Sequence, residues 1–506
     1  MNEPGLVSLV GAGPGDPGLL TLRAAAALRS ADVLLYDALA SDPVVEFVSA
    51  GCERIYVGKR GGHHAMAQTQ IEALMVEHAR AGRRVVRLKG GDVFVFGRGG
   101  EEAQALRKAG IPFEIVPGIT SAIAAPAYAG IPVTHRDFNT GFTILTGHED
   151  PLKATSSLDW SKLADPHRTL VLLMAMGNLA SIMQRLAQAG LPADTPAAVI
   201  SEGTRPEQRT VTGTIASIAS EVANEGLAAP AIVVVGNVVR LREEIRWFDT
   251  TALFGKRVLI TRPAHQAESF ARALYARGVV PVLAPTIEIG PPDDVHAAHH
   301  AIDHLAEFGW VVFTSANGVD AFFERLASLE SDARYLGKTR VAAIGAKTSE
   351  RLLHYGVRAN LVPRAFISEE IARALIEATA DGEHILIYRA QDARDVLPEM
   401  LVDAGRRATV IAAYKTSFES DPRFAEKVAR ADVLTFTSAS TVRGFAHLLG
   451  GDEPAVQAAA AKVVACIGPI TAEAATEIGL RVDVVADVFT SDGLLDALQA
   501  HFSVHA

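Results

Sequence analysis

The stretch VSLVGAGPGDPGLLTLRAAAAL, residues 7–28, predicts a short strand, a glycine-rich turn and a helix. Val7–Val10 is an apolar run, and Leu20–Leu28 carries helical periodicity. Similar runs alternate through the first half of the chain, which predicts an α/β fold with mostly parallel sheets. We expect the other strands at Val33–Tyr36, Arg84–Leu88, Phe113–Val116, Phe142–Leu145, Leu170–Met174, Ala197–Ile200 and Ala231–Val235, and the other helices at Gln68–Ala81 and Glu101–Ala109.

The composition is that of a folded protein, with 49% hydrophobic and 21% charged residues among 506. This length suggests about three domains, and the apolar content excludes an intrinsically disordered chain. The net charge of −10 disfavours a nucleic-acid partner. The two cysteines, Cys52 and Cys466, have no metal-binding spacing, and the sequence shows neither a signal peptide nor a membrane span. We therefore expect a cytoplasmic protein without a metal site or a membrane partner.

Three breaks interrupt the alternating pattern. Pro117–Thr120 is a sharp turn at which a first α/β unit could give way to a second. Glu149–His167 is polar and predicts a long loop. Phe248–Thr251 ends the pattern of the first half, and a new strand is expected directly after it. The chain is therefore expected to consist of two large halves.

The second half contains an internal repeat. Phe313–Asn317 (FTSAN) returns as Phe436–Ser440 (FTSAS), 123 positions later, and Ile344–Gly345 returns at the same offset as Ile467–Gly468. Motifs that keep one spacing indicate a duplicated structural unit. We therefore expect two copies of one α/β unit in this half.

The first half carries three glycine-rich loops. Gly11–Gly18 follows a strand and precedes a helix, where glycines allow a ligand to approach the backbone. It departs from the dinucleotide-binding pattern, because Asp16 stands where the third glycine belongs, so a dehydrogenase is the weaker alternative. A tight turn without a ligand is another alternative. Val57–His64 and Arg87–Glu102 combine glycines with charged residues, which is typical of a site rather than of a solvated surface.

The first half resembles uroporphyrinogen-III C-methyltransferase over about residues 5–247. The resemblance is carried by GAGPGD, YD, VGKR, RLKGGD, FVFGRGGEE, VPGITSA, AGIPVTHR and TGH, in that order. It implies a tetrapyrrole-methylase fold of two α/β subdomains, 1–117 and 118–247. It also implies two methyl transfers from S-adenosyl-L-methionine to uroporphyrinogen III, giving precorrin-2, which leads to sirohaem or cobalamin, with S-adenosyl-L-homocysteine as the second product. A homodimer is expected from the same resemblance.

The resemblance also assigns residues. The methyl donor is expected at Pro14, Gly90, Gly91, Asp92, Val95, Thr120, Ser121, Met174 and Gly203. Asp37 is expected to accept a proton, or else to be a structural residue at the end of a strand, and Lys59 to donate a proton or to bind a substrate carboxylate. Because the substrate is a polyanion, further counter-charges are expected at Arg60, Lys89, Arg98, His135 and Arg136, although surface solvation would explain each of them. Val93, Ser121 and Ala175 depart from the family pattern, which bears on affinity for the donor.

The second half, 254–506, resembles uroporphyrinogen-III synthase through VLITRP, AYKT and the repeated FTS and IG motifs. The implied fold has two α/β lobes on a two-strand hinge, lobe one from 254–289 and 417–506 and lobe two from 290–416. The implied reaction closes hydroxymethylbilane to uroporphyrinogen III with inversion of the last ring. A binding or regulatory module without catalysis is the alternative.

Few catalytic side chains are expected in this half, because orienting a flexible substrate supplies much of the rate. Tyr414 matches the family's tyrosine and could assist loss of the substrate hydroxyl, or could pack at the hinge. Weaker candidates for binding substrate carboxylates are Thr314, Ser315, Thr348, Thr437 and Ser438. The more common role of a serine before a helix, as at Ser315 and Ser438, is to cap that helix. Together the two halves predict a bifunctional enzyme.

Overall fold

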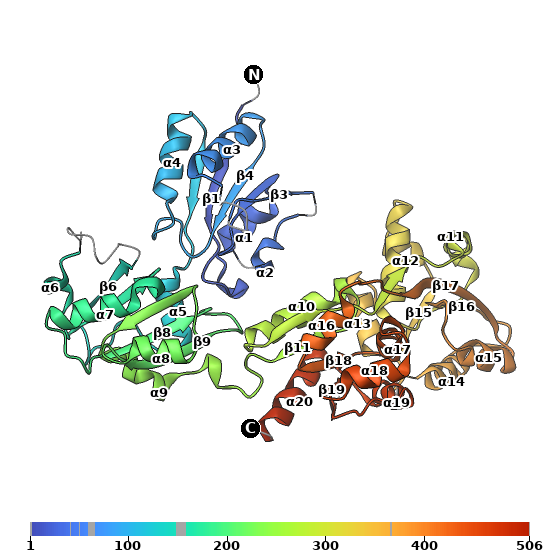
Figure 1. Cartoon of the computed structure of the whole chain (residues 1–506). Helices are drawn as coiled ribbons and strands as arrows, with labels where there is room; N and C mark the ends of the chain where they lie inside the picture. The colour runs from blue at the N-terminus through green and yellow to red at the C-terminus, as the bar shows by residue number, and fades with distance from the viewer. Residues whose placement is uncertain are drawn as a thin grey trace. The chain divides into compact units, whose positions relative to one another are not determined.

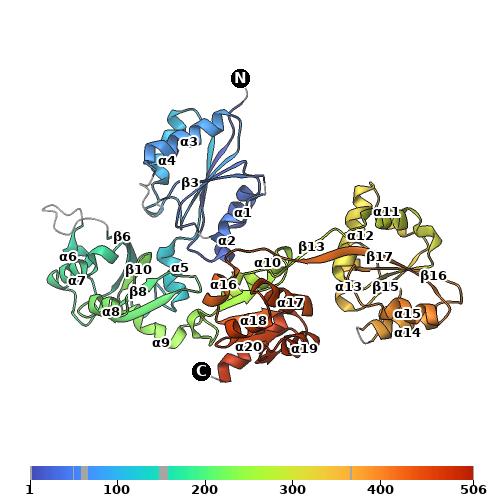
Figure 2. The ribbon, with the colours of Figure 1, turned by 45° about the vertical axis from the view of Figure 1, so that its right-hand side comes forward.

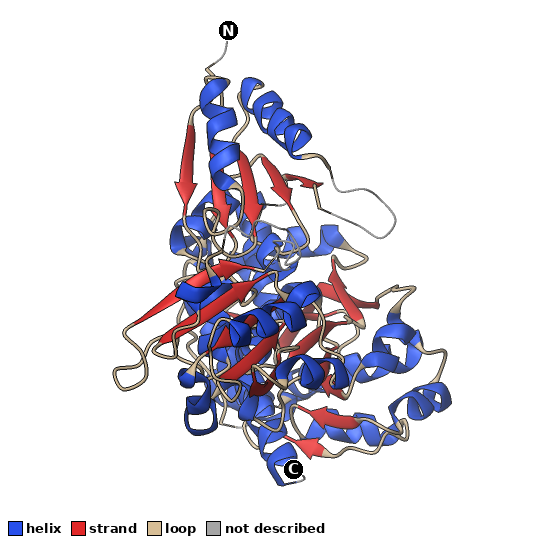
Figure 3. Cartoon of the chain, turned by 60° about the vertical axis from the view of Figure 1, so that its left-hand side comes forward, coloured by secondary structure: helices blue, strands red, loops and turns tan. Residues whose placement is uncertain are grey.

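The computed structural model describes residues 3–40, 42–49, 51–58, 66–147, 158–364 and 367–504. The chain is α/β throughout, with helices along the faces of its sheets (Figures 1 and 3). It divides into two compact units, which comprise Met1–Val258, Ser269–Val282 and Ser491–Ala506 in unit 1, and Leu259–Glu268 and Leu283–Thr490 in unit 2. Among the described residues, we find no helix with the length and apolar character needed to cross a bilayer.

The first sheet has the strand order β3-β2-β4-β1-β5, and all its neighbouring pairs are parallel. Adjacent residues of one strand enter different cores, with Leu34 against Leu28 and Leu35 against Met75. Helices α1 and α2 therefore cover one face, and α3 and α4 cover the other (Figure 2). The elements are β1 (Val7–Gly11), α1 (Leu22–Arg29), β2 (Val33–Tyr36), α2 (Asp42–Val45), β3 (Glu53–Tyr56), α3 (Gln68–Arg80), β4 (Val85–Lys89), α4 (Gly99–Lys108) and β5 (Phe113–Val116).

The neighbouring strands β1 and β4 form a topological switch point. After β1 the chain crosses by way of α1 to β2, and after β4 it crosses by way of α4, on the opposite face, to β5. In open α/β sheets, ligands bind outside the carboxyl ends of the strands at such a point. The glycine-rich loops 11–18 and 90–98 follow these two strands, so the fold places both loops where a ligand is expected.

The second sheet has the order β6-β7-β10-β8-β9 and is mixed. Only β6 and β7 pair in parallel, while β10 runs antiparallel to β7 and β8, and β9 runs antiparallel to β8. The expectation of mostly parallel sheets is wrong here, because the turn 202–208 joins β8 to β9 as an antiparallel hairpin, and β10 lies between β7 and β8 and runs against both of them. The elements are α5 (Ser121–Tyr128), β6 (Gly141–Thr146), α6 (Trp160–Leu163), β7 (Arg168–Leu173), α7 (Leu179–Gln188), β8 (Pro196–Ser201), β9 (Arg209–Thr214), α8 (Ile218–Asn224), β10 (Ala231–Val235) and α9 (Arg242–Ile245).

The expected loop at Glu149–His167 is partly wrong. Residues 148–157 lie outside the described residues, but helix α6 occupies the segment that follows them. Trp160 and Leu163 are spaced three residues apart and pack against the core of the second sheet. The apolar pair at helical spacing therefore makes this segment helical, although the residues around it are polar.

Two further sheets follow in the second half of the chain. Their orders are β12-β11-β18-β19-β20 and β13-β17-β16-β14-β15. In the latter sheet, β13 is antiparallel to β17, and the other pairs are parallel. The strands are β11 (Arg257–Ile260), β12 (Val280–Leu283), β13 (Ile287–Gly290), β14 (Trp310–Phe313), β15 (Arg340–Ala343), β16 (His384–Ala390), β17 (Arg407–Phe418), β18 (Val433–Phe436), β19 (Val463–Cys466) and β20 (Val484–Val485).

The helices of this half repeat in geometry as well as in sequence. Ser315 and Ser438 begin equivalent helices with nearly equal backbone angles, φ −162° and ψ 158° against φ −165° and ψ 160°. The duplication predicted from the FTS motif is therefore present in the backbone. The helices are α10 (Ala264–Ala276), α11 (Val295–Asp303), α12 (Ala316–Ser328), α13 (Ala346–His354), α14 (Ser368–Ala378), α15 (Val396–Asp403), α16 (Phe424–Arg430), α17 (Ala439–Leu448), α18 (Asp452–Ala459), α19 (Pro469–Glu477) and α20 (Ser491–Val504).

Candidate functional site

Three loops of unit 1 meet at the switch point. Gly13 and Gly91 exchange backbone hydrogen bonds, with N–O distances of 3.2 and 2.7 Å. The Asp92 carboxylate accepts hydrogen bonds from the backbone N–H groups of Gly118 and Phe94, at 3.0 and 2.8 Å. Asp92 therefore ties the loop after β4 to the loop after β5.

Glycine is required where these loops cross. A Cβ atom on Gly118 would lie 2.2 Å from the Gly91 carbonyl oxygen, and one on Gly11 would lie 2.5 Å from the Gly118 nitrogen. Gly91 has a φ of +67°, in the left-handed region that other residues rarely adopt. The three backbones thus form a close crossing of loops, which we call the cradle, and Gly91 and Gly118 in it are partly exposed.

The second sheet contributes two further loops. Met174 follows β7 with a φ of +55° and a half-exposed side chain, a strained conformation typical of binding sites. Gly203 follows β8, and a Cβ atom there would lie 2.4 Å from the Cβ of Ala125 in α5. Thr120 caps α5 by accepting a hydrogen bond from the Ala122 N–H at 3.3 Å.

All nine residues expected to hold the methyl donor are described, and they lie after the carboxyl ends of strands, Ser121 as the first residue of α5 and the others on loops. Pro14 follows β1, the residues at 90, 91, 92 and 95 follow β4, and Thr120 and Ser121 follow β5. The structure brings the last two close to the cradle, because a Cβ on Gly91 would lie 3.7 Å from the Ser121 nitrogen.

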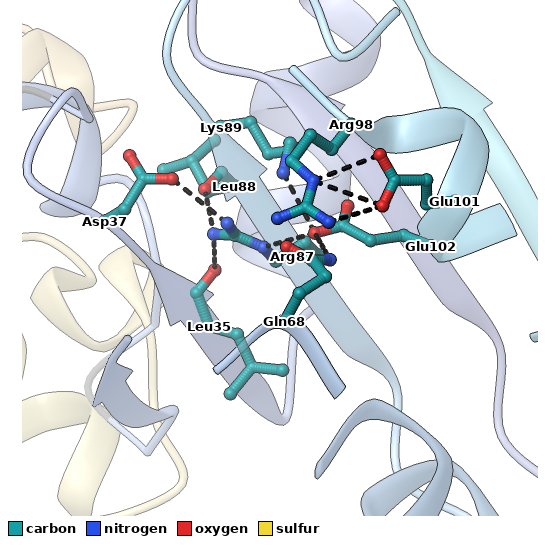
Figure 4. A network of polar contacts seen from close by, with 9 residues as sticks. All are labelled: Leu35, Asp37, Gln68, Arg87, Leu88, Lys89, Arg98, Glu101 and Glu102. Carbon is teal, nitrogen blue, oxygen red and sulfur yellow. Dashed lines mark hydrogen bonds and ion pairs between the residues drawn. The ribbon is translucent and has the colours of Figure 1, made fainter. Parts of the chain in front are cut away.

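Asp37 stands at the carboxyl end of β2 and belongs to a network of charged groups (Figure 4). Its Oδ2 accepts a hydrogen bond from the Arg87 guanidinium at 3.0 Å. Arg87 also reaches the Glu102 carboxylate, at 3.2 Å, and Lys89 Nζ lies 2.9 Å from the same carboxylate oxygen. Asp37 itself is only partly buried, so its carboxylate borders the space outside the sheet.

The expectation for Lys89 needs correction. Its side chain is buried and paired with Glu102, and burial together with the nearby Arg87 charge lowers the pKa of Lys89. A side chain held in this way does not present a free charge to a substrate carboxylate. Lys59 and Arg60, the other cations expected near Asp37, lie outside the described residues.

The remaining expected counter-charges of unit 1 lie at the surface. Arg98 precedes α4 with a φ of +59° and pairs with Glu101 at 2.5 Å. His135 Nδ1 accepts a hydrogen bond from the Asp137 N–H at 3.2 Å, and Arg136 is exposed. Large apolar side chains are exposed on the loops after β2, β4, β5 and β7 and at the start of α5, namely Leu39, Phe94, Phe96, Ile119, Ile123 and Met174. Apolar and cationic side chains together suit a large anionic ring.

In unit 2, Tyr414 lies on β17 with its hydroxyl 3.1 Å from the Ser315 hydroxyl. Ser315 caps α12 by accepting a hydrogen bond from the Gly318 N–H at 3.0 Å. Both the expected cap and the expected site residue are therefore part of one contact. A pocket of about 610 Å³ opens beside it, lined among others by Tyr414, Asn317, Asp320, Arg325, Arg351 and His299.

The other candidates of this half lie at equivalent helix starts. Ser438 caps α17 by accepting a hydrogen bond from the Thr441 N–H at 3.3 Å, and its hydroxyl lies 2.9 Å from that of Ser440. Thr314 and Thr437 are half-buried, whereas Thr348 is buried in the first turn of α13. Thr348 is therefore the candidate least able to reach a ligand in this conformation.

The charged residues that line this pocket were not predicted from the sequence. Arg351 pairs with Asp320, and Arg325 donates a hydrogen bond to the Val295 carbonyl at 2.8 Å. These charged residues belong to none of the repeated motifs, and they lie on two successive helices, α12 and α13. Their spacing along the chain carries no signal of this contact.

Two family models match the chain. Residues 6–219 match "Tetrapyrrole (Corrin/Porphyrin) Methylases", and residues 268–496 match "Uroporphyrinogen-III synthase HemD". The "Porphyrin biosynthesis protein HemD" of Ruminiclostridium josui is 38% identical over 500 residues, which is 98% of either chain. The chain belongs to this HemD porphyrin biosynthesis family. In this HemD family member, a tetrapyrrole methylase is followed by a uroporphyrinogen-III synthase domain.

Two other proteins are similar to parts of this HemD family member. The "Uroporphyrinogen-III C-methyltransferase" of Bacillus subtilis is 44% identical over 345 residues, 68% of this chain and 71% of that protein. The crystal structure of the uroporphyrin-III C-methyl transferase of Thermus thermophilus, complexed with S-adenyl homocysteine, is 39% identical. The match covers 47% of this chain and 100% of the Thermus thermophilus chain, with a TM-score of 0.40.

Proposed function

We propose that this protein catalyses two consecutive steps of tetrapyrrole biosynthesis. Its synthase domain closes hydroxymethylbilane to uroporphyrinogen III, and its methylase domain transfers two methyl groups from S-adenosyl-L-methionine to that product, which gives precorrin-2. The observation that carries the proposal is the match over nearly the full length to a porphyrin biosynthesis protein, together with the presence of both family matches in this one chain. The shared intermediate, uroporphyrinogen III, is a chemical reason for joining the two domains.

The cradle of unit 1 suits the methyl donor. S-Adenosylmethionine supplies an electrophilic methyl group and leaves as S-adenosylhomocysteine. The loops at Pro14, Gly90–Asp92 and Val95 are proposed to hold the donor, and Thr120, Ser121, Met174 and Gly203 to complete the surrounding wall. Holding donor and ring in line supplies much of the rate of such a transfer.

Gly118→Ala is expected to weaken the binding of S-adenosylhomocysteine at least ~10-fold and to destabilise the methylase by about 1–3 kcal/mol. The added Cβ would lie 2.2 Å from the Gly91 carbonyl oxygen, so the cradle must open. Calorimetric titration and thermal unfolding measure the two effects. Gly100→Ala is the matched control, because no atom lies within 4 Å of its Cβ position and the residue is helical. Equal affinities in both variants would contradict the assigned cradle.

Asp37 is proposed as the base of the methylation. The methylated ring is cationic and loses a carbon-bound proton, which a carboxylate can accept. The Arg87 guanidinium at 3.0 Å and the Leu39 N–H at 3.2 Å hold one carboxylate oxygen each. We retain Lys59 as proton donor or carboxylate ligand, and Arg60, Arg98, His135 and Arg136 as counter-charges to the substrate.

In the synthase, Tyr414 is proposed to donate a proton to the leaving hydroxyl. Its phenol lies at the wall of the pocket beside β13 and α12, and the Ser315 hydroxyl at 3.1 Å can orient the O–H. Thr314, Thr437 and Ser438 are proposed to bind substrate carboxylates at the two repeated helix starts. Loss of hydroxyl leaves a stabilised cation, so the domain mainly has to fold the linear chain into the closing geometry.

We further propose the limits of the two enzymes and the setting in which they act. The methyltransferase extends over 1–247, with subdomains 1–117 and 118–247, and the synthase over 254–506, with lobe one from 254–289 and 417–506 and lobe two from 290–416. A homodimer formed through the methylase and a cytoplasmic location complete the proposal. Both cysteines are free and buried, which is compatible with a reducing compartment.

The test is product analysis after the purified chain receives hydroxymethylbilane and S-adenosylmethionine without oxygen. Precorrin-2 is expected, formed faster than the spontaneous closure of hydroxymethylbilane to the type I isomer. Only type I products, methylated or not, would show that the second half is a binding module rather than a synthase. Uroporphyrinogen III without any methylated product would overturn the methyltransferase half of the proposal.

A further inference from the structure

Glu102 is a fully buried carboxylate with an uneven set of contacts. Its Oε1 accepts hydrogen bonds from Lys89 Nζ at 2.9 Å, Gln68 Nε2 at 3.1 Å and Arg87 Nε at 3.2 Å. Its Oε2 is also buried and has no hydrogen-bond partner within the described part of the chain. All three donors thus converge on one oxygen from β4 and α3 (Figure 4).

Stability alone does not account for this cluster. Replacing a buried ion network by apolar side chains of similar volume is often neutral or stabilising, because the desolvation of the charges is costly. An unpaired buried oxygen adds to that cost. Other strand positions of the same sheet are filled by Val, Leu and Ile, which shows that this core accommodates apolar residues. The arrangement therefore points to a task beyond holding the fold.

The contacts of Arg87 indicate that task. Its guanidinium donates to Glu102 Oε1 on one side and to Asp37 Oδ2, 3.0 Å away, on the other. It also donates to the Leu88 carbonyl at 2.8 Å, so the planar group is fixed in orientation. A guanidinium can bridge two carboxylates in this way, whereas an ammonium group has no such planar fork. Glu102 therefore fixes the orientation of the Arg87 guanidinium, and the guanidinium in turn fixes the orientation of the Asp37 carboxylate.

Glu102 also closes the loop that follows β4. Lys89 immediately precedes Gly90, and Glu102 lies in the first turn of α4, directly after the loop. The ion pair between these two residues ties the two ends of the loop 90–98 together. Phe96 and Arg98 in this loop have positive φ angles, so its shape must be held from outside.

We propose that Glu102 is a positioning residue of the methyltransferase, which acts through Arg87 to fix the Asp37 carboxylate where it takes up the proton. The proposal rests on the methyltransferase function proposed above. Glu102 has no contact with the substrate in this role. It sets the direction of a guanidinium, and that guanidinium sets the direction of the carboxylate.

The test is Glu102→Gln, which keeps the shape of the side chain and removes its charge. We expect kcat for methylation to fall about 10–100-fold, because a misplaced catalytic group is costly. KM for uroporphyrinogen III and the Kd of S-adenosylhomocysteine should stay within about twofold, because the amide oxygen of glutamine can still accept the hydrogen bond from Lys89 Nζ and keep the loop 90–98 closed. Glu114→Gln is the matched control. Glu114 lies on β5 of the same sheet and pairs with Arg23 at 2.7 Å, so this variant also breaks an ion pair but should keep the rate of the wild type.

A double-mutant cycle with Asp37→Asn separates positioning from a merely structural role. If Glu102 acts through Asp37, Glu102→Gln has no further effect on kcat once Asp37 is Asn. An equal loss of kcat in both backgrounds, or a loss of S-adenosylhomocysteine binding that parallels kcat, would overturn the proposal. If the Glu102→Gln variant does not fold, Arg87→Lys is used for the same test. A methylation rate of the Arg87→Lys variant equal to that of the wild type would also overturn the proposal.

The wild-type protein is assayed first, so that the two levels of inference are distinguished. If it forms no methylated product, the methyltransferase proposal fails, and the positioning role of Glu102 fails with it. If it methylates and Glu102→Gln methylates equally fast, only the positioning role fails.

Discussion

Asp37→Asn is expected to slow the methylation of uroporphyrinogen III by roughly 10²–10⁴-fold, the usual loss when a general base is removed. Asparagine has nearly the same shape, and its amide oxygen can still accept the hydrogen bond from Arg87, now 3.0 Å from Oδ2. It cannot accept a proton from the ring. We therefore expect binding of S-adenosylhomocysteine to stay within about twofold, as measured by calorimetry, while methyl incorporation falls.

Two controls accompany this variant. Asp32→Asn changes a carboxylate at the other end of the same strand, where Asp32 pairs with Arg84 at 3.0 Å, and it should leave the rate unchanged. Closure of hydroxymethylbilane by the Asp37→Asn protein should also be unchanged, because the synthase is a separate domain. A methylation rate close to that of the wild type would show that Asp37 is not the base and has only a structural role at the end of its strand.

The sequence predicts apolar strands well and polar edge strands poorly. β1, β2, β4 and the edge strand β5 lie within two residues of their expected bounds, because each of them is rich in apolar residues. β3 and β9 were not predicted. Both are edge strands, at Glu53–Tyr56 and Arg209–Thr214, and their polar, partly exposed side chains give no apolar run.

Strand direction in the second sheet could not be predicted from the same pattern. An apolar run such as Ala231–Val235 has the same composition in either direction, and hydrogen bonding to neighbours decides the pairing. Helices between strands favour a parallel arrangement, and α8 does join two strands of one direction, because β9 and β10 both run antiparallel to β8. The reversal occurs at the turn 202–208 between β8 and β9, which contains no helix, and the position of β10 between β7 and β8 adds two more antiparallel pairs.

The glycine motifs predicted where the candidate site lies, but the contacts of its charged residues were not predicted. Glycine motifs mark places of close backbone approach, and the structure has such contacts at Gly11, Gly91 and Gly118. Lys89 was expected as a counter-charge to the substrate, with solvation at the surface as the alternative, but its side chain is buried. The overlooked signal is the strand itself: Arg87 and Lys89 are two residues apart on one face of a strand that is buried on both sides, which requires a buried anion nearby. That anion is Glu102.

Tyr414→Phe is expected to slow the formation of the type III isomer about 100-fold or more and to raise the share of type I product. Phenylalanine keeps the packing of the ring, which is 9% exposed, and removes only the hydroxyl that lies 3.1 Å from the Ser315 Oγ. Without help in losing its hydroxyl, more of the substrate is left to close spontaneously. The isomer ratio after a fixed time is the measurement, with the rate of substrate loss beside it.

The alternative for Tyr414 is a purely structural role at the hinge, and the same variant distinguishes the two. A packing role is retained by phenylalanine, so an unchanged isomer ratio would remove Tyr414 from the mechanism. Tyr335→Phe is the matched control, because Tyr335 is 41% exposed and lies outside the pocket lining.

Ser315→Ala should slow ring closure less than Tyr414→Phe does, since it removes a neighbour that orients the phenol and leaves the phenol in place. It should also cost about 1 kcal/mol of stability through the lost cap of α12. An effect of Ser315→Ala on stability alone would show that the serine only caps the helix and that Tyr414 acts without it.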